Sequence, residues 1–372
     1  MKKPFKIVDT RVVYDKGMAQ LAGSVELADD GSLISTFSEW TDAIVGNVVH
    51  VIRSEDQGRS WSDTGIMIKT AREEGGVHVA LGMGRLSDGR IILPYADFES
   101  GRDSADEHPR LMKNKPRLSE AYIIESNDCG VTWSQPRKLE LGYNSVCFYG
   151  KIRELGNGRI LLPINTAHVE TGKNRNRKNH AVGFAISEDG GITWPELIRI
   201  FCKGSEKLGE TDFIICRDGS YLAVNRTNGE LCCTRSADKG DTWSAVSGTG
   251  IGGQSPCLHY TSHGRLLLAY RAGDIKDPKN GNKGGLGISW SNDDGYSWEG
   301  ELILKDPKGY QYKKWHETGM PSIVTLPDGR IFVQFYSYDP DLPYAPSEEP
   351  WREIPHIFKR YIAANILEEL SE

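Results

Sequence analysis

The sequence predicts an all-β fold, a six-bladed β-propeller with four antiparallel strands in each blade, and three observations support this prediction. The pattern Ser-x-Asp-x-Gly-x-x-Trp occurs five times, beginning at Ser54, Ser126, Ser187, Ser236 and Ser291. Six shorter turns of the Asp-Gly, Asn-Gly or His-Gly kind each precede a run rich in β-forming residues. The glycines of these turns are 45 to 69 residues apart, a spacing typical of propeller blades.

The repeated octapeptide has the composition of a tight hairpin. In the first copy, Asp56 can accept hydrogen bonds from nearby backbone amides and Gly58 can adopt a positive φ. The side chain of Trp61 can then pack between neighbouring sheets. Because turn chemistry accounts for all three residues, we expect the octapeptides to be scaffold and to carry no catalytic group.

The order of the two turns defines the repeat. Each unit contains strand 1, the short glycine turn, strand 2, a variable loop, strand 3, the octapeptide turn and strand 4. The sixth unit lacks the octapeptide and ends with one strand-like run at 360–366. We expect the N-terminal run 7–14 to complete the sixth blade and close the ring, which removes a free sheet edge. Residues 1–372 then form a single domain.

Composition limits the possible partners and the compartment. The net charge of −6 gives no general attraction to nucleic acid or to an anionic membrane. No stretch of 18 apolar residues occurs, and the N-terminus lacks the apolar segment of a signal peptide. The seven cysteines have no metal-like spacing, so we expect reduced thiols in a cytoplasmic protein without metal or cofactor. The alternative is an exported protein whose signal has been removed.

In an up-and-down blade, the variable loops and the starts of the inner strands lie on the face opposite the repeated turns. Long loops on a rigid scaffold are the usual place for binding and catalysis. Carboxylates, arginines and tyrosines that converge there are typical of glycoside chemistry. The candidates are Asp42, His78, Asp97, Tyr149, Glu210, Asp212, Arg226, Gln254, Arg271, Lys283, His316, Glu317 and Tyr336.

The five octapeptides resemble the Asp-box, or BNR, repeats of the sialidase (neuraminidase) superfamily. The resemblance implies an exo-acting glycoside hydrolase that removes a terminal sugar from an oligosaccharide or glycan. It also implies roles for three residues. Asp42, 12 residues before the first octapeptide, matches the general acid. Glu210 matches the activating glutamate, and Arg226, 16 residues later, matches an arginine of the carboxylate-binding triad.

Three positions depart from this family pattern. Gln20–Gly23 replaces the Arg-Ile-Pro segment, so the first arginine of the triad is missing. Lys283 or Arg271 is the candidate for the third arginine, and Met320 stands where the family has its nucleophilic tyrosine. The departures argue against an ordinary sialoside or against the usual retaining mechanism.

Two carboxylates then suffice for glycoside hydrolysis. We expect Asp42 as the acid, with Glu210, Glu317 or Asp212 as the base or nucleophile. A separation of about 5 Å between the two carboxyl groups implies retention, and one of roughly 6.5 to 9.5 Å implies inversion.

Basic loops at 110–117 and 173–178 favour an acidic sugar such as a uronate or sialate. Two alternatives remain from other classes of protein. One is a propeller lyase acting on a uronate, with His78, His316 or Tyr336 as the base and Arg226 or Arg271 neutralising the carboxylate. The other is a glycan-binding propeller without catalysis. The sequence does not encode the oligomeric state.

Overall fold

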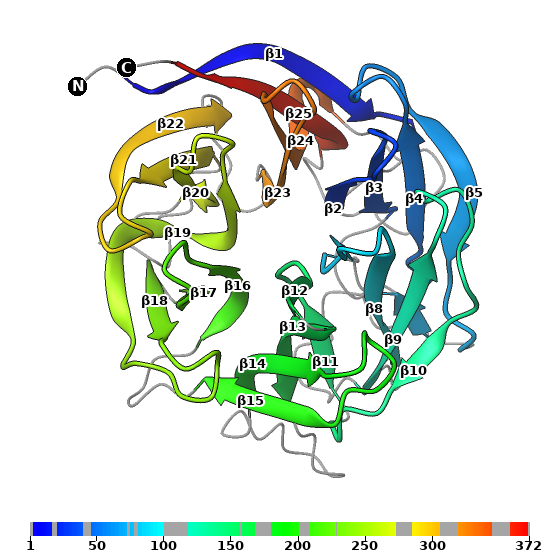
Figure 1. Ribbon diagram of the computed structural model, residues 1–372. Coiled ribbons are helices and arrows are strands. Elements are labelled where there is room, and N and C mark those ends of the chain that lie inside the picture. The colour runs from blue at the N-terminus through cyan, green and yellow to red at the C-terminus, as the bar shows by residue number, and fades with distance from the viewer. Residues whose placement is uncertain are drawn as a thin grey trace.

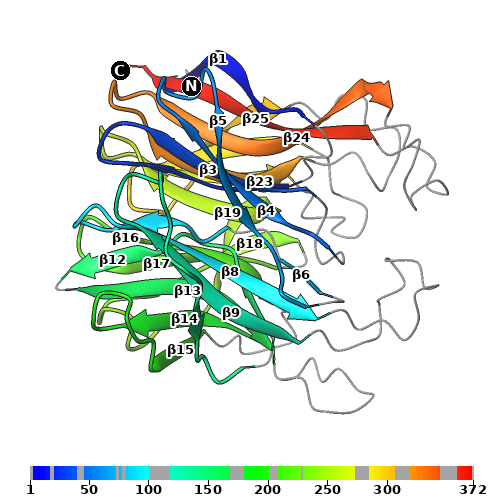
Figure 2. The same ribbon diagram turned by 90° about the vertical axis from the view of Figure 1, so that its right-hand side faces the viewer.

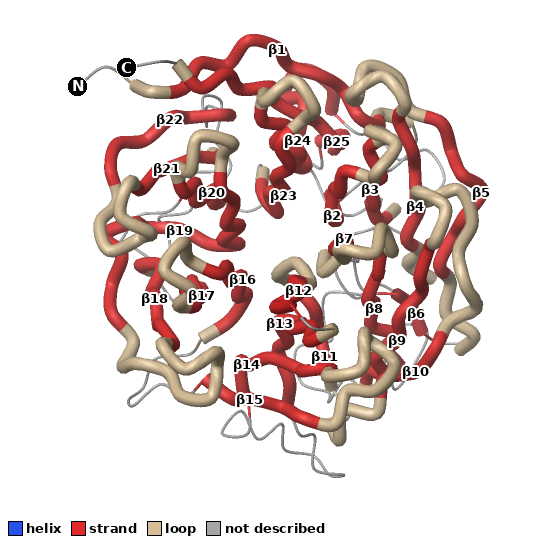
Figure 3. Tube along the Cα trace, viewed as in Figure 1, coloured by secondary structure: helices blue, strands red, loops and turns tan. Residues whose placement is uncertain are grey.

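The structure is a computed structural model in which every regular element of the described residues is a β-strand (Figure 3). The described residues are 3–16, 21–39, 46–72, 75–77, 81–99, 118–143, 145–156, 158–167, 180–200, 208–227, 229–272, 285–305, 318–343 and 358–370. The strands form sheets arranged around a common axis, like the blades of a propeller (Figure 1). No helix of these residues is long and apolar enough to cross a membrane.

Two of the sheets have four strands. The first contains β2 (Leu21–Leu27), β3 (Leu33–Ser38), β4 (Val49–Ser54) and β5 (Ser62–Ile68). The other contains β1 (Phe5–Tyr14), β25 (Phe358–Glu369), β24 (Ile331–Pro343) and β23 (Gly319–Thr325). The side view shows these last four strands together at one edge of the ring (Figure 2).

Two further sheets have five strands because the innermost strand is divided into two short pieces. One contains β6 (Gly75–Val77), β7 (Gly84–Arg85), β8 (Ile91–Glu99), β9 (Ser119–Ser126) and β10 (Arg137–Leu139). The next contains β11 (Val146–Phe148), β12 (Arg153–Gly156), β13 (Arg159–Ala167), β14 (His180–Ser187) and β15 (Glu196–Ile200).

The last sheet has seven strands. It contains β16 (Gly209–Ile215), β17 (Tyr221–Arg226), β18 (Glu230–Ser236), β19 (Ser247–Tyr260), β20 (Leu266–Ala272), β21 (Leu286–Ser291) and β22 (Glu299–Lys305). The strand β19 is 14 residues long. Its first half pairs with β18 and its second half with β20, so it ends one repeat and begins the next.

The prediction of a six-bladed ring with four strands in each blade is therefore wrong. The described strands form five hydrogen-bonded sheets, because the fourth and fifth repeats share the seven-stranded one. The expected pairing of the N-terminal run is confirmed. The strand β1 pairs antiparallel with β25, so the first and the last strand of the chain lie side by side (Figure 1).

The octapeptide turns have the predicted structure. In the first turn, Asp56 Oδ1 accepts hydrogen bonds from the backbone amide of Ser60 at 2.8 Å and that of Arg59 at 3.0 Å. The amide of Gly58 donates to Ser54 Oγ at 2.8 Å, and Gly58 has a φ of +86°. The bond from the glycine amide to the serine hydroxyl recurs in the other four copies. So does the bond to the aspartate from the amide four residues after it, and these repeated bonds fix the backbone of each turn.

The hydrophobic core lies between neighbouring sheets. Ile52 of β4 and Phe332 of β24 belong to one cluster, which joins the first sheet to the last. The ring of Trp61 lies 6.2 Å from that of Phe332, and the ring of Trp243 lies 5.0 Å from that of Phe184. These two octapeptide tryptophans therefore pack against a neighbouring sheet, as predicted. This packing fixes the sheets around the axis and positions the ends of their inner strands.

Candidate functional site

The strands nearest the ring axis have irregular strand pairing at the same end of the ring. The register shifts between Ala22 and Val25 in β2, between Gly209 and Thr211 in β16, and between Gln254 and Cys257 in β19. A fourth shift lies in β23, between Gly319 and Ser322. Such bulges redirect side chains and are frequent beside active sites. They lie near the strand starts, at the ends away from the octapeptide turns.

The bulge in β16 carries the central ion pair of the site. Gly209 pairs with Arg226 of β17, and Glu210 occupies the bulge immediately after it. Arg226 Nη1 donates to Glu210 Oε1 at 2.6 Å. The carboxylate is buried, whereas the side chain of Arg226 is 34% exposed, so the arginine can also meet a ligand. The structure thus brings together Glu210 and Arg226, which the sequence analysis assigned to the same site.

The other oxygen of Glu210 faces β19. Glu210 Oε2 accepts hydrogen bonds from the backbone amide of Ser255 at 2.8 Å and from its hydroxyl at 3.0 Å. Both carboxylate oxygens are therefore acceptors. This arrangement suits a base, a nucleophile or an anchor for an arginine, and it does not suit a proton donor.

A second polar group continues the same face. Arg271 of β20 pairs in register with Gln254 and donates a hydrogen bond to its side-chain oxygen. Arg271 also donates to the hydroxyl of Tyr336 at 3.3 Å, and the guanidinium of Arg360 lies 5.1 Å from the centre of the Tyr336 ring. Since Gln254 precedes Ser255, the two groups form one polar arc across β16, β19, β20 and β24.

Asp97 lies at the end of β8 and is buried. Burial raises the pKa of its carboxyl, although a hydrogen bond from Thr70 at 2.6 Å and the charge of Arg72 at 3.6 Å oppose the change. Arg72 also binds Glu120 at 2.7 Å and lines a cleft of about 440 Å³ together with Lys138 and other residues. Asp97 is thus linked through Arg72 to a cleft that is lined by residues of β9, β10 and β11.

Asp212 is placed differently from the expected site. It is 1% exposed and accepts hydrogen bonds from the backbone amides of Leu258 at 2.7 Å and Lys151 at 3.2 Å. Burial raises the pKa of its carboxyl, while Arg153 at 3.6 Å opposes the change. Asp212 therefore ties neighbouring inner strands together inside the protein.

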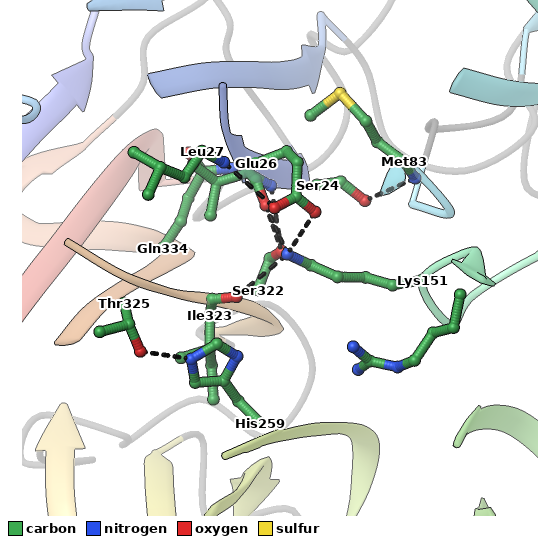
Figure 4. Close-up of polar contacts among 12 residues, drawn as sticks. Ser24, Glu26, Leu27, Met83, Lys151, His259, Ser322, Ile323, Thr325 and Gln334 are labelled. Atoms are coloured by element: carbon green, nitrogen blue, oxygen red, sulfur yellow. Dashed lines mark hydrogen bonds and ion pairs between the residues drawn. The ribbon is translucent and has the colours of Figure 1, made fainter. Parts of the chain in front are cut away.

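Lys151 forms a second buried network near the axis (Figure 4). Its Nζ donates to the backbone oxygens of Val25 at 2.7 Å and Ile323 at 3.0 Å, and lies 3.2 Å from Glu26. His259 contacts Thr325 at 2.7 Å nearby; burial and then the charge of Lys151 lower the pKa of its imidazole to about 3. The strand residues of this network come after the bulges in the inner strands and lie nearer to the glycine turns.

The remaining candidates are less informative. Tyr149 is partly buried and packs against the hydrophobic cluster that contains Tyr336. Among residues described by the structure, no group of three or more His, Cys, Asp or Glu is placed to hold a metal ion. Five expected residues lie outside the described residues: Asp42, His78, Lys283, His316 and Glu317.

Residues 112–333 match the BNR repeat-like domain family. The chain belongs to this family. No curated protein matches it. A crystallised protein of unknown function from Dyadobacter fermentans is 20% identical to this BNR repeat-like chain, with a TM-score of 0.74 over 99% of this chain and 100% of that one.

Two solved enzymes share the fold of this BNR repeat-like protein. A mutant of the NanB sialidase from Streptococcus pneumoniae is 15% identical, with a TM-score of 0.66 over 98% of this chain and 71% of that one. An α-L-arabinanase from Penicillium chrysogenum, complexed with arabinobiose, is 13% identical, with a TM-score of 0.61 over 97% and 98%. At these identities the likeness concerns the fold.

Two residues of the polar arc were missed from the sequence. Ser255 reaches Glu210 only because β19 bulges, and no local pattern announces that bulge except the proline that follows it. Arg360 lies at the start of the last strand, opposite Tyr338 of β24. This pairing places Arg360 at the same end of the ring as Tyr336. The register of the pairing was hard to predict from the sequence, because the sixth repeat lacks the octapeptide that marks the strand order in the other repeats.

Proposed function

We propose that this BNR repeat-like protein is a glycoside hydrolase that removes a terminal acidic sugar from a glycan, with Glu210 at the reacting centre. The observation that carries the proposal is the ion pair between Glu210, near the start of β16, and Arg226, at the end of β17. Arg271 and Tyr336 continue the polar arc beside it. The fold that the protein shares with a sialidase and an arabinanase supports the same class of reaction.

The chemistry assigns Glu210 the role of base or nucleophile, because both of its oxygens accept hydrogen bonds. Hydrolysis also needs an acid that protonates the leaving oxygen while water supplies the new hydroxyl. Asp42 is the acid proposed from the sequence. Arg226 and Arg271 are the groups that suit the carboxylate of the sugar, since guanidinium groups bind carboxylates through charge-assisted hydrogen bonds.

The test is hydrolysis of a panel of aryl glycosides that includes a sialoside and a uronide. Glu210→Gln is expected to lower the rate on the active substrate by about 10²- to 10⁴-fold, the usual contribution of a base. Glu125→Gln is the matched control, because Glu125 also pairs with an arginine, Arg137 at 2.8 Å, but lies beside an octapeptide turn. The control should keep its activity.

Three results would contradict the proposal. Full activity of Glu210→Gln would remove this carboxylate from the reaction. An unsaturated product that absorbs in the ultraviolet would indicate a lyase. Binding of glycans without turnover of any substrate in the panel would indicate a glycan-binding protein.

A further inference from the structure

The bulge in β19 holds Ser255 in a backbone conformation that serine rarely adopts. Gln254 pairs with Arg271 and Cys257 with Ala269, so Ser255 lies in the irregular step between them. Its φ is +52°, in the left-handed region that favours glycine. Strained residues of this kind cluster at functional sites when the surroundings hold them in place. Ser255 is also buried, which leaves its hydroxyl to a partner within the protein.

We propose that Ser255 is a positioning residue for Glu210, a role that rests on the proposed function of that carboxylate. The amide and the hydroxyl of Ser255 both donate to Glu210 Oε2, at 2.8 and 3.0 Å. Arg226 holds Oε1 at 2.6 Å from the other side. The carboxylate is therefore fixed by donors from β17 and β19 while its own backbone belongs to β16.

The conformation at Ser255 explains why both donors reach one oxygen. In a regular strand, the amide of Ser255 would take part in the ladder with β20, and the side chain would point to one face of the sheet. The bulge frees the amide and turns it towards Glu210, on the same side as the hydroxyl. A glycine would fit the φ better but would supply only the amide.

A second bulge shows that the hydroxyl is not required by the backbone. In β23, Met320 has a φ of +51° and is followed by a proline, as Ser255 is. Methionine has no hydroxyl to donate. The same turn therefore forms without a serine, and the hydroxyl in β19 is explained by its contact with Glu210.

The two donors also distinguish the oxygens of the carboxylate. Oε2 accepts two hydrogen bonds from Ser255, which engages both of its lone pairs. Oε1 accepts one hydrogen bond from Arg226, so it is the oxygen with accepting capacity left for a substrate proton or carbon. Ser255 thus selects which oxygen of Glu210 reacts.

The contact is tested first without a substrate, by a double-mutant cycle in urea unfolding. Ser255→Gly keeps the backbone conformation and removes the hydroxyl. We expect Ser255→Gly to raise the unfolding equilibrium constant about fivefold more in the wild-type background than in the Glu210→Gln background. The reason is that the hydrogen bond to the charged carboxylate is lost only in the wild-type background. Ser322→Ala is the control, since its buried hydroxyl lies in the β23 bulge and contacts Val25. It should show no coupling to Glu210→Gln.

The positioning role is tested on the aryl glycoside that the protein hydrolyses. Ser255→Gly should lower kcat about 10-fold and leave KM within about twofold, because one hydrogen bond to a charged group is lost while the sugar contacts remain. Ser322→Ala should leave both kcat and KM within about twofold of the wild-type values.

The outcomes separate the two proposals. If Glu210→Gln is inactive but Ser255→Gly resembles Ser322→Ala in coupling and in kcat, Ser255 has no positioning role and the proposed function stands. If Glu210→Gln is fully active, the proposed function fails and the role of Ser255 fails with it. If Ser255→Gly is coupled to Glu210→Gln and has a lower kcat with an unchanged KM, both proposals are supported.

Discussion

At the scale of single residues, the octapeptide aspartates have a common environment that affects acid stability. In the third copy, the hydroxyl and amide of Thr193 and the hydroxyl of Ser187 hold the pKa of Asp189 at about 2. The same kind of bonds hold the pKa of Asp238 at about 2. These bonds are stronger when the carboxylate is ionised, so the turns are most stable when it is charged.

The first prediction concerns the pH dependence of unfolding. The folded pKa of Asp189 lies below the ordinary value of 3.8. Its contribution is therefore present above about pH 4 and is lost as the pH falls towards 2. We expect the urea midpoint to fall steeply over this range. Asp189→Asn should make the fall shallower, and an unchanged pH dependence in this variant would contradict the assignment.

The candidate site could be predicted from the sequence only where its residues follow from strand order. Glu210 and Arg226 belong to adjacent strands of one hairpin, and their pairing follows from the short turn between them. Ser255 and Arg360 could not be predicted in the same way. One depends on a bulge, and the other on the pairing of the last strand with β24.

At the scale of elements, the glycine of each octapeptide is expected to have two separate roles. Gly58 has a φ of +86°, and a Cβ there would lie 2.5 Å from Phe332 Cε2. Gly65 has a φ of +75°, but a Cβ there would meet nothing within 4 Å. A substitution at Gly65 therefore tests backbone strain alone, whereas a substitution at Gly58 also tests the close approach of Phe332 from a neighbouring sheet.

We predict that Gly65→Ala will cost about 1 kcal/mol of unfolding free energy, the usual cost of placing alanine at a positive φ. Gly58→Ala should cost about 1 to 3 kcal/mol more, because Phe332 must also move. Urea denaturation of the two variants measures the difference. Equal losses would show that the approach of Phe332 is not limiting.

The strand β19 shows why the number of sheets could not be predicted. Its first half contains Gly248, Gly250, Gly252 and Gly253, a composition that is typical of a turn or linker. In the structure this segment pairs with β18, and the chain then continues without a break into the pairing with β20. Backbone hydrogen bonds to strands on both sides overcome the low strand preference of glycine, and no local pattern reveals them.

At the scale of the whole molecule, the repeats, the all-β fold and the joining of the N-terminal run to the last sheet followed from the sequence. The contacts that hold the inner strands together across the axis did not. Lys151 belongs to the segment between β11 and β12 but donates to Val25 of β2 and Ile323 of β23. One side chain thus connects three sheets that are distant in sequence.

We predict that Lys151→Met will reduce the unfolding free energy by about 3 kcal/mol, because Glu26 and two backbone oxygens lose a buried partner. Lys138→Met is the control. That lysine pairs with Glu120 on the surface and is 43% exposed, so its loss should destabilise the protein much less than the loss of Lys151. Urea unfolding of both variants measures the two changes in unfolding free energy. Similar changes would mean that the buried contacts of Lys151 do not stabilise the ring.

The pairing of β1 with β25 has a consequence for chain connectivity. The amide of Leu370 donates to the backbone oxygen of Pro4 at 2.8 Å, so the described ends of the polypeptide are hydrogen-bonded neighbours. A short linker between them would turn the linear order of the repeats into a cyclic one. New ends could then be opened at an exposed octapeptide tip, such as the one after Asp189. Circular permutation would thereby preserve every sheet while changing which repeat is synthesised first.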